Sequence, residues 1–124
     1  MLSKTRVLIV EDDPSFRMAL TRLLQRLGFD ARAVGTVREG YEQIDAWGPD
    51  AAVIDLVLPD DHGAALLHAI RERGLPIKVA IVTGMPDVDD HPEILRLNPD
   101  LVLQKPIDIF NLAGWLGPAH RLEP

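Results

Sequence analysis

Short apolar runs alternate with amphipathic stretches along the 124 residues of the chain. The apolar runs have the length and the β-branched content of strands, and the clearest of them cover residues 7–10, 51–57, 79–82 and 101–103. A weaker strand is predicted over residues 29–34. The runs at 51–54 and 79–82 are almost continuously apolar, which is typical of strands buried on both faces of a parallel sheet.

Helical periodicity and capping residues predict helices between these runs. Apolar residues from Phe16 to Leu27 recur at helical spacing, with Pro14 at a favourable first position and Gly28 just past the end. The second helix is expected to begin in the sequence Thr-Val-Arg-Glu at residues 36–39, which is a capping-box pattern, and to stop at a glycine.

The later helices carry weaker signals. A third helix is predicted over residues 62–73, where a glycine follows its end. Three prolines, Pro86, Pro92 and Pro99, leave only residues 93–97 able to form regular helix before the last strand. We therefore expect a fourth helix that is short or partly irregular.

Five strands that alternate with five helices predict right-handed βαβ units and a parallel sheet with helices on both faces. A chain of this length can bury one hydrophobic core and is too short for two domains of usual size. No linker or internal repeat interrupts the pattern. The expected fold is one α/β domain over residues 1–124, with a doubly wound five-stranded parallel sheet.

Composition narrows the class of protein further. The net charge is −6 and 26% of residues are charged, as in an ordinary soluble protein, and no Lys/Arg cluster favours direct binding of nucleic acid. The chain has no cysteine, which excludes disulfides and thiol nucleophiles. Its apolar runs are too short for a signal peptide or a membrane span. We expect a cytoplasmic protein without membrane insertion.

Polar side chains follow four of the predicted strands, where open parallel sheets bind their ligands. Taken singly, each has a structural explanation: an acid before Pro14 caps a helix, a threonine after a strand forms a turn, and a lysine is usually solvated. Asp55 is harder to explain in this way, because an unpaired carboxylate inside an apolar run is costly. The residues concerned are Glu11, Asp12, Asp13, Asp55, Thr83 and Lys105.

Together these groups predict phosphoryl chemistry. The carboxylates of Asp12 and Asp55, with Glu11 acting more distantly, suit Mg²⁺ or Mn²⁺, which prefer oxygen ligands. An aspartate can attack phosphorus and form an aspartyl phosphate. Lys105 would neutralise the phosphoryl oxygens, and the Thr83 hydroxyl would hydrogen-bond one of them.

The segments VLIVEDD, DLVLPDDHG, VTG and LQKP resemble, in order and spacing, the receiver domains of bacterial response regulators, the CheY-like superfamily. The resemblance covers essentially the whole chain. It implies a flavodoxin-like sheet with strand order 2-1-3-4-5. It also implies Asp55 as phosphoacceptor, Asp12 as direct metal ligand, Glu11 as its outer partner and the Val57 backbone carbonyl as a further ligand.

The same resemblance implies a switch role for the Thr83 hydroxyl, a phosphate-binding role for Lys105 and a cis peptide bond between Lys105 and Pro106. Pro59 and Gly63 match the loop after the acceptor, where they shape a turn. The implied partners are a sensor histidine kinase or a histidine phosphotransfer protein and a downstream protein target. Such a domain catalyses only its own phosphorylation and dephosphorylation, as a monomer or a weak homodimer.

Two departures from the family pattern affect the output. Val102 stands where the family usually has an aromatic residue, and the fourth helix is broken by prolines. We therefore expect the signal to leave through residues 84–91 and the short helix that follows.

The lifetime of the phosphoryl group depends on two variable positions that flank the site. Val57 and Met85 occupy them and cannot orient an attacking water, which predicts slow dephosphorylation.

Two other functions remain as alternatives. A pseudo-receiver that serves as a docking scaffold usually lacks the acceptor or the lysine, and both are present. An aspartate-based phosphohydrolase on a similar fold is disfavoured because Glu11 replaces the first aspartate of its motif and Pro14 follows the motif directly.

Overall fold

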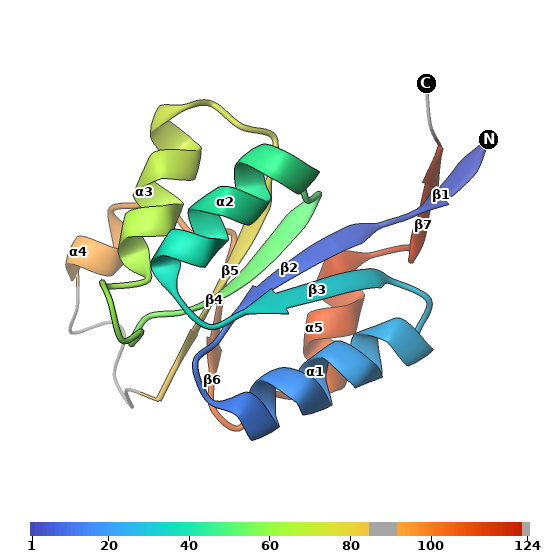
Figure 1. Ribbon diagram of the computed structural model, residues 1–124, viewed down its shortest axis with the longest axis horizontal. Coiled ribbons are helices and arrows are strands. Elements are labelled where there is room, and N and C mark those ends of the chain that lie inside the picture. The colour runs from blue at the N-terminus through green and yellow to red at the C-terminus, as the bar shows by residue number, and fades with distance from the viewer. Residues whose placement is uncertain (85–91, 123–124) are drawn as a thin grey trace.

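The computed structural model describes residues 1–84 and 92–122, and its centre is a five-stranded parallel sheet (Figure 1). The strand order is β3-β2-β4-β5-β6, which is the predicted 2-1-3-4-5 order once the short strand β1 is left out of the count. The strands are β2 (Arg6–Val10), β3 (Asp30–Val34), β4 (Ala51–Asp55), β5 (Lys78–Thr83) and β6 (Leu101–Gln104).

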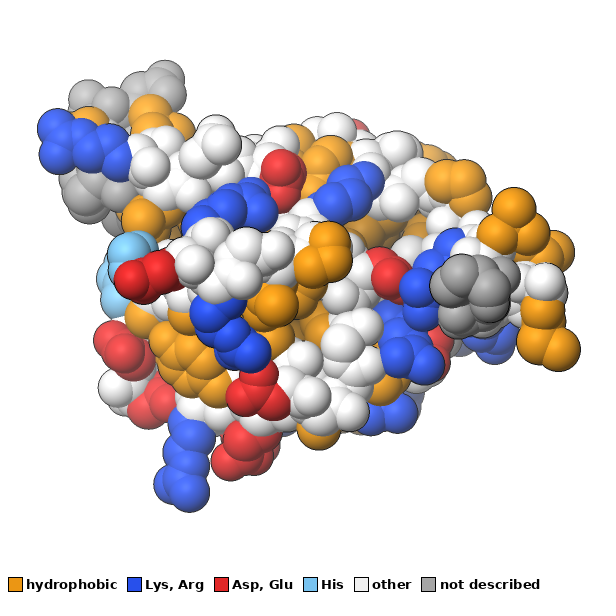
Figure 2. Space-filling view, turned by 90° about the horizontal axis from the view of Figure 1, so that it is seen from above, with side chains coloured by type: hydrophobic (Ala, Val, Ile, Leu, Met, Phe, Trp, Pro, Cys, Tyr) orange, Lys and Arg blue, Asp and Glu red, His pale blue; other side chains and the backbone are white. Residues whose placement is uncertain are grey.

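Helices cover both faces of this sheet, as predicted (Figure 1). On one face lie α1 (Pro14–Arg26) and α5 (Ile109–Leu116), and on the other lie α2 (Val37–Trp47), α3 (Ala64–Glu72) and α4 (Pro92–Leu95). In the view from above in Figure 2, acidic and basic side chains are interspersed with apolar and uncharged ones. On that face, the basic side chains of the described residues form no single continuous surface of the kind that would favour nucleic-acid binding.

Two apolar cores sandwich the sheet because side chains alternate along each strand. Ile54 of β4 packs into the core beneath α2 and α3, whereas its neighbour Val53 packs into the core above α1 and α5. All five residues of β4 are buried, which explains the unbroken apolar run in the sequence. This central strand carries Asp55 at its carboxyl end.

The helix starts follow the predicted caps. The Asp13 carboxylate accepts hydrogen bonds from the first turn of α1, and the Thr36 hydroxyl accepts one from Glu39 N–H at the start of α2. The third helix begins at Ala64 rather than at residue 62, because Gly63 N–H donates to the Leu56 carbonyl and closes a turn there.

The fourth helix is a single turn, as its prolines predict, although it spans Pro92–Leu95 instead of residues 93–97. Proline suits the first position of a helix, where no N–H is needed. The chain leaves the helix through a turn in which Asn98 adopts a positive φ of 56°. The position of the element was therefore predicted, and its bounds were two residues off at the end.

One element was missed. Strands β1 (Leu2–Lys4) and β7 (His120–Leu122) pair as an antiparallel ribbon that brings both ends of the chain together (Figure 1). Each strand has three residues, which is too short for a pattern of alternating burial to stand out in the sequence.

Candidate acidic site at the carboxyl edge of the sheet

The carboxyl ends of four parallel strands bring the predicted polar residues to one edge of the sheet. Asp55 and Thr83 are the last residues of β4 and β5, and Glu11 follows β2 directly. Lys105 follows β6, and its backbone N–H donates to the Thr83 carbonyl at 2.9 Å. Groups up to 94 residues apart in sequence thus meet, as the strand pattern predicts.

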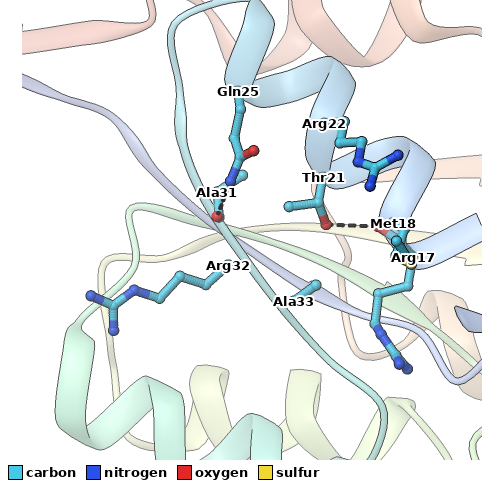
Figure 3. A pocket seen from close by; sticks show the side chains of 8 residues that line it. All are labelled: Arg17, Met18, Thr21, Arg22, Gln25, Ala31, Arg32 and Ala33. Atoms are coloured by element: carbon cyan, nitrogen blue, oxygen red, sulfur yellow. Dashed lines mark hydrogen bonds between the residues drawn. The ribbon is translucent and has the colours of Figure 1, made fainter.

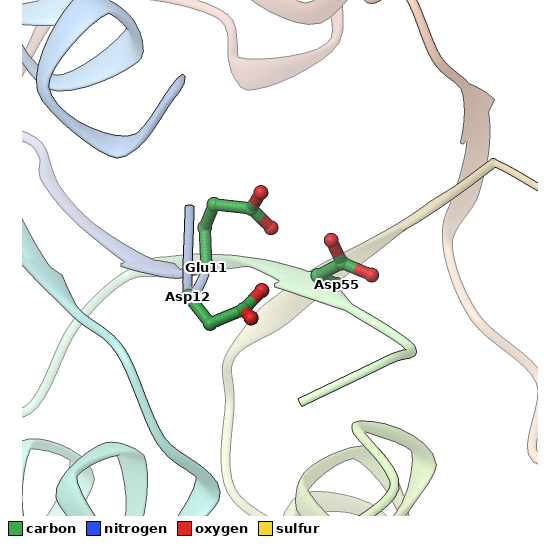
Figure 4. Close-up of side chains that lie close together, drawn as sticks. All are labelled: Glu11, Asp12 and Asp55. Carbon is green, nitrogen blue, oxygen red and sulfur yellow. The ribbon is translucent and has the colours of Figure 1, made fainter. Parts of the chain in front are cut away.

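Three carboxylates form the core of this site, which we call the acidic cluster. One oxygen each from Glu11, Asp12 and Asp55 lies within 4.8 Å of the other two, and Figure 4 shows Glu11 and Asp12 extending toward Asp55. Glu11 and Asp55 are buried, whereas Asp12 is exposed. Carboxylates held this close repel one another and favour a bound cation.

Lys105 is the cation that the structure places in the acidic cluster. Its Nζ lies 2.7 Å from Asp55 Oδ2 and 3.0 Å from Glu11 Oε1. Glu11, for which the sequence predicts a more distant role, is therefore in direct contact with the lysine. Its second oxygen, Oε2, is buried and has no hydrogen-bond partner among the described residues.

The pKa values of the two buried carboxylates, Glu11 and Asp55, shift in opposite directions. Burial, together with the neighbouring Asp55 carboxylate, raises the pKa of Glu11 to about 7. Burial also acts to raise the pKa of Asp55, but interactions with Glu11, Lys105 and Val57 N–H outweigh it and hold that pKa below its usual value. Asp55 is thus ionised at neutral pH, while Glu11 exchanges a proton there.

The loop after β4 shapes the surroundings of Asp55. Val57 N–H donates to Asp55 Oδ1 at 2.9 Å, which fixes the second carboxylate oxygen. Gly63 lies against the Asp55 backbone, and a Cβ at this position would overlap the Asp55 carbonyl oxygen. Gly63 is therefore required by packing, in agreement with its predicted part in the turn. The Lys105–Pro106 bond is cis, as predicted.

Arg17 contacts the backbone of the acidic cluster, a role that the sequence pattern did not predict. Its guanidinium donates to the Glu11 carbonyl at 3.0 Å and the Asp12 carbonyl at 3.4 Å. A Cβ on Gly35 would lie 2.8 Å from the same guanidinium, so this position leaves room for Arg17. An arginine on a helix is normally read as a solvated charge, and only the fold brings it to these carbonyls.

Asp60 is a second residue that the sequence did not single out. Its carboxylate accepts hydrogen bonds from Val37 N–H at 2.9 Å and from Arg38 N–H at 3.0 Å, in the first turn of α2. These hydrogen bonds lower the pKa of Asp60. The loop after Asp55 is thereby tied to residues that precede Asp60 by 22 and 23 positions in the chain, which no local pattern indicates.

A separate hollow of about 340 Å³ lies between α1 and the edge strand β3 (Figure 3). Its lining includes three arginines, but Figure 3 shows Arg32 pointing away from Arg17 and Arg22. Arg32 stacks on Trp47, 4.4 Å from the ring centre. No set of polar groups converges inside this hollow, so the acidic cluster is the better candidate for the functional site.

The structure describes only some of the residues that are predicted to transmit the signal from the site. Val102 lies on β6 opposite Ile81 and is half-buried. Met85 and the rest of residues 85–91 lie outside the described residues. The predicted output route through this segment therefore stays a prediction.

Comparison with known proteins assigns the chain to a family. Residues 7–115 match the family model described as the response regulator receiver domain, and the chain belongs to that family. The fold and the two-component signalling class predicted from the motifs are thereby confirmed.

No helix among the described residues is both long enough and apolar enough to cross a membrane.

Three relatives illustrate the match. The chain is 31% identical to the response regulator protein PilR of Pseudomonas aeruginosa over 98% of its own length and 27% of that protein. It is 32% identical to the acid tolerance regulatory protein ActR of Rhizobium meliloti, over 95% of its length and 62% of that protein. The signal receiver domain of a putative Luxo repressor protein from Vibrio parahaemolyticus superimposes with a TM-score of 0.81 at 29% identity, covering 89% of this chain and 85% of that one. The chain thus spans less than two thirds of these two regulators.

Proposed function

We propose that residues 1–124 act as a phosphoacceptor switch in which Asp55 takes a phosphoryl group from a histidine kinase or a histidine phosphotransfer protein. The observation that carries the proposal is the charge and the position of the Asp55 carboxylate. Its carboxylate is ionised, sits at the end of the central strand and faces two further carboxylates and one lysine. Nucleophilic attack on phosphorus needs such a charged and fixed oxygen.

The chain's own residues have distinct parts in this reaction. An oxygen of Asp55 forms a bond to phosphorus while the bond between phosphorus and the donor's leaving atom breaks, and the bonding electrons depart with the donor. Val57 N–H holds the other oxygen in place. Lys105 neutralises charge on the phosphoryl oxygens, and the Thr83 hydroxyl donates a hydrogen bond to one of them.

The acidic cluster fits a divalent cation. Three carboxylates face a single lysine, and the buried Glu11 Oε2 lacks a partner among the described residues, which is the setting in which a hard cation is favourable. Glu11, Asp12, Asp55 and the Val57 carbonyl are the groups that would hold Mg²⁺ or Mn²⁺. When bound, the cation supplies positive charge that offsets repulsion between the carboxylates and the incoming phosphoryl group.

The wider role follows from this switch. The phosphorylated domain regulates a downstream protein target in the cytoplasm, as a monomer or a weak homodimer, and the catalysis it performs is limited to its own phosphorylation and dephosphorylation. The relatives PilR and ActR carry the names of regulatory proteins, which supports a signalling output.

Incubation with Mg²⁺ and acetyl phosphate, followed by intact mass measurement, tests the assignment. The parent should gain one phosphoryl group, and Asp55→Asn should gain none. Asp61→Asn is the matched control, because Asp61 is an exposed aspartate in the same loop and should leave labelling intact. Labelling of Asp55→Asn would refute the assignment, and an unlabelled parent would favour a docking scaffold instead.

A further inference from the structure

An aromatic ring faces the lysine of the site. Lys105 Nζ lies 4.8 Å from the centre of the Phe16 ring, within the range of a cation–π interaction. Phe16 is held in the first turn of α1, where its backbone N–H donates to the capping carboxylate of Asp13. The ammonium therefore has two carboxylates as hydrogen-bond partners and an aromatic face as a further neighbour.

The same ring also packs against the segment that follows the lysine. Phe16 lines a small apolar hollow of about 90 Å³ together with Ile107 and Ile109, just beyond the cis bond. It therefore lies beside both the charged end of the Lys105 side chain and the segment that follows the lysine in the chain.

We propose that Phe16 is a positioning residue that keeps the Lys105 ammonium over Asp55, an inference that rests on the function proposed above. The lysine side chain is 31% exposed and has four rotatable bonds, so its ammonium is free to turn toward water whenever it gives up a carboxylate partner. An aromatic face attracts the ammonium without fixing the direction of its N–H bonds. The ammonium can then exchange a carboxylate oxygen for a phosphoryl oxygen and stay beside the ring.

A purely structural role for Phe16 makes a different prediction. If the ring only fills space between α1 and the loop, any apolar side chain of similar size should serve. Phe16→Leu keeps an apolar side chain and removes the aromatic face, whereas Phe16→Tyr keeps the face. Leu23→Ala is the matched control, because Leu23 lines the same hollow and offers no aromatic face to the ammonium.

The contact itself can be measured without any phosphate. Ring currents should shift the Lys105 Hε resonances upfield in the NMR spectrum of the parent, Phe16→Tyr and Leu23→Ala. Phe16→Leu should lose that shift. Unchanged Lys105 resonances in Phe16→Leu would overturn the proposal.

Phosphorylation kinetics then test whether the contact between Phe16 and Lys105 affects the reaction. With acetyl phosphate and Mg²⁺, Phe16→Leu should lower the phosphorylation rate constant at saturating donor by roughly two- to tenfold, at an unchanged melting temperature. Phe16→Tyr and Leu23→Ala should stay within about twofold of the parent. Equal slowing in Phe16→Leu and Phe16→Tyr would show that the aromatic face is irrelevant and would overturn the proposal. A parent that takes no phosphate refutes the proposed function, while the Lys105 resonances still decide whether Phe16 holds the ammonium.

Discussion

Carboxylates have different environments at the two edges of the central sheet. At the amino edge, Asp50 and Asp100 each directly precede a strand and are satisfied. Asp50 accepts a hydrogen bond from Arg6 N–H at 2.8 Å and forms an ion pair with Arg121. Asp100 accepts from Val79 N–H and from the Arg71 guanidinium, both at 2.7 Å.

At the carboxyl edge, three carboxylates lie close together, Lys105 forms ion pairs with Glu11 and Asp55, and a buried oxygen of Glu11 is left without a partner among the described residues. The pKa values follow this difference. Burial acts to raise the pKa of Asp100, but Val79 N–H and Arg71 outweigh it and lower that pKa. Burial and Asp55 instead raise the pKa of Glu11 to about 7. At the amino edge each acid is paired with its own donors, whereas at the carboxyl edge an ionised Asp55 lies beside a crowded Glu11 whose second oxygen is available for a ligand.

The largest expected effect comes from Asp55→Asn. An amide is no nucleophile, so phosphoryl labelling should be lost completely. The substitution removes the ion pair with Lys105 but also relieves repulsion with Glu11, so the melting temperature should change little. Intact mass and thermal unfolding measure the two effects. A drop of several degrees in the melting temperature would mean that the carboxyl edge supports stability after all.

Asp100→Ala should show the opposite behaviour. It leaves Val79 N–H without its acceptor and removes the ion pair with Arg71, which should lower the free energy of unfolding by about 1–3 kcal/mol at neutral pH. Labelling of Asp55 should persist, because the two edges are separated by the length of the strands. Urea unfolding gives the free energy, and Asp61→Ala provides an exposed control.

The pH dependence of this effect has a definite sign. Because the folded pKa of Asp100 lies below the usual 3.8, its carboxylate stabilises the fold above that value, and this stabilisation is lost as the pH falls through the folded pKa. The difference between the parent and Asp100→Ala should therefore be constant near neutrality and shrink in acid. A difference that grows in acid would contradict the assignment.

The sequence predicted the carboxyl edge better than the amino edge. Residues that end parallel strands must share an edge, so Glu11, Asp55, Thr83 and Lys105 could be grouped from the strand pattern alone. The hydrogen bond and the ion pair of Asp50 depend on the meeting of distant segments, and Arg121 reaches it because it lies in the β1–β7 ribbon.

The same reasoning explains the residues missed at the site. Arg17, Asp60 and Phe16 act through contacts between helices and loops, and their local sequences indicate only an ordinary helix face or a turn. The start of the third helix was misplaced because the turn that delays it is closed by tertiary packing of Gly63 against Asp55.

A divalent cation should affect only the carboxyl edge. At a Mg²⁺ concentration a few times its dissociation constant, binding should stabilise the parent by about 1 kcal/mol through mass action. Asp12→Ala removes one carboxylate and should reduce the shift in melting temperature, whereas Asp100→Ala should keep it. Unchanged melting curves for both the parent and Asp12→Ala at millimolar Mg²⁺ would count against a metal site.

The smallest effect concerns how long the phosphoryl group stays on Asp55. Val57 is 70% exposed and stands two residues beyond the acceptor, where an apolar side chain cannot orient an attacking water. The phosphorylated parent should therefore lose its group slowly. Val57→Asn adds an amide that can hydrogen-bond water, and it should shorten the half-life by roughly threefold, since an exposed amide holds water only loosely. Val57→Leu keeps the position apolar and should leave the half-life unchanged. The decay is followed by intact mass after removal of the donor, and a parent that loses its phosphoryl group within seconds would show that water is oriented by something other than this position.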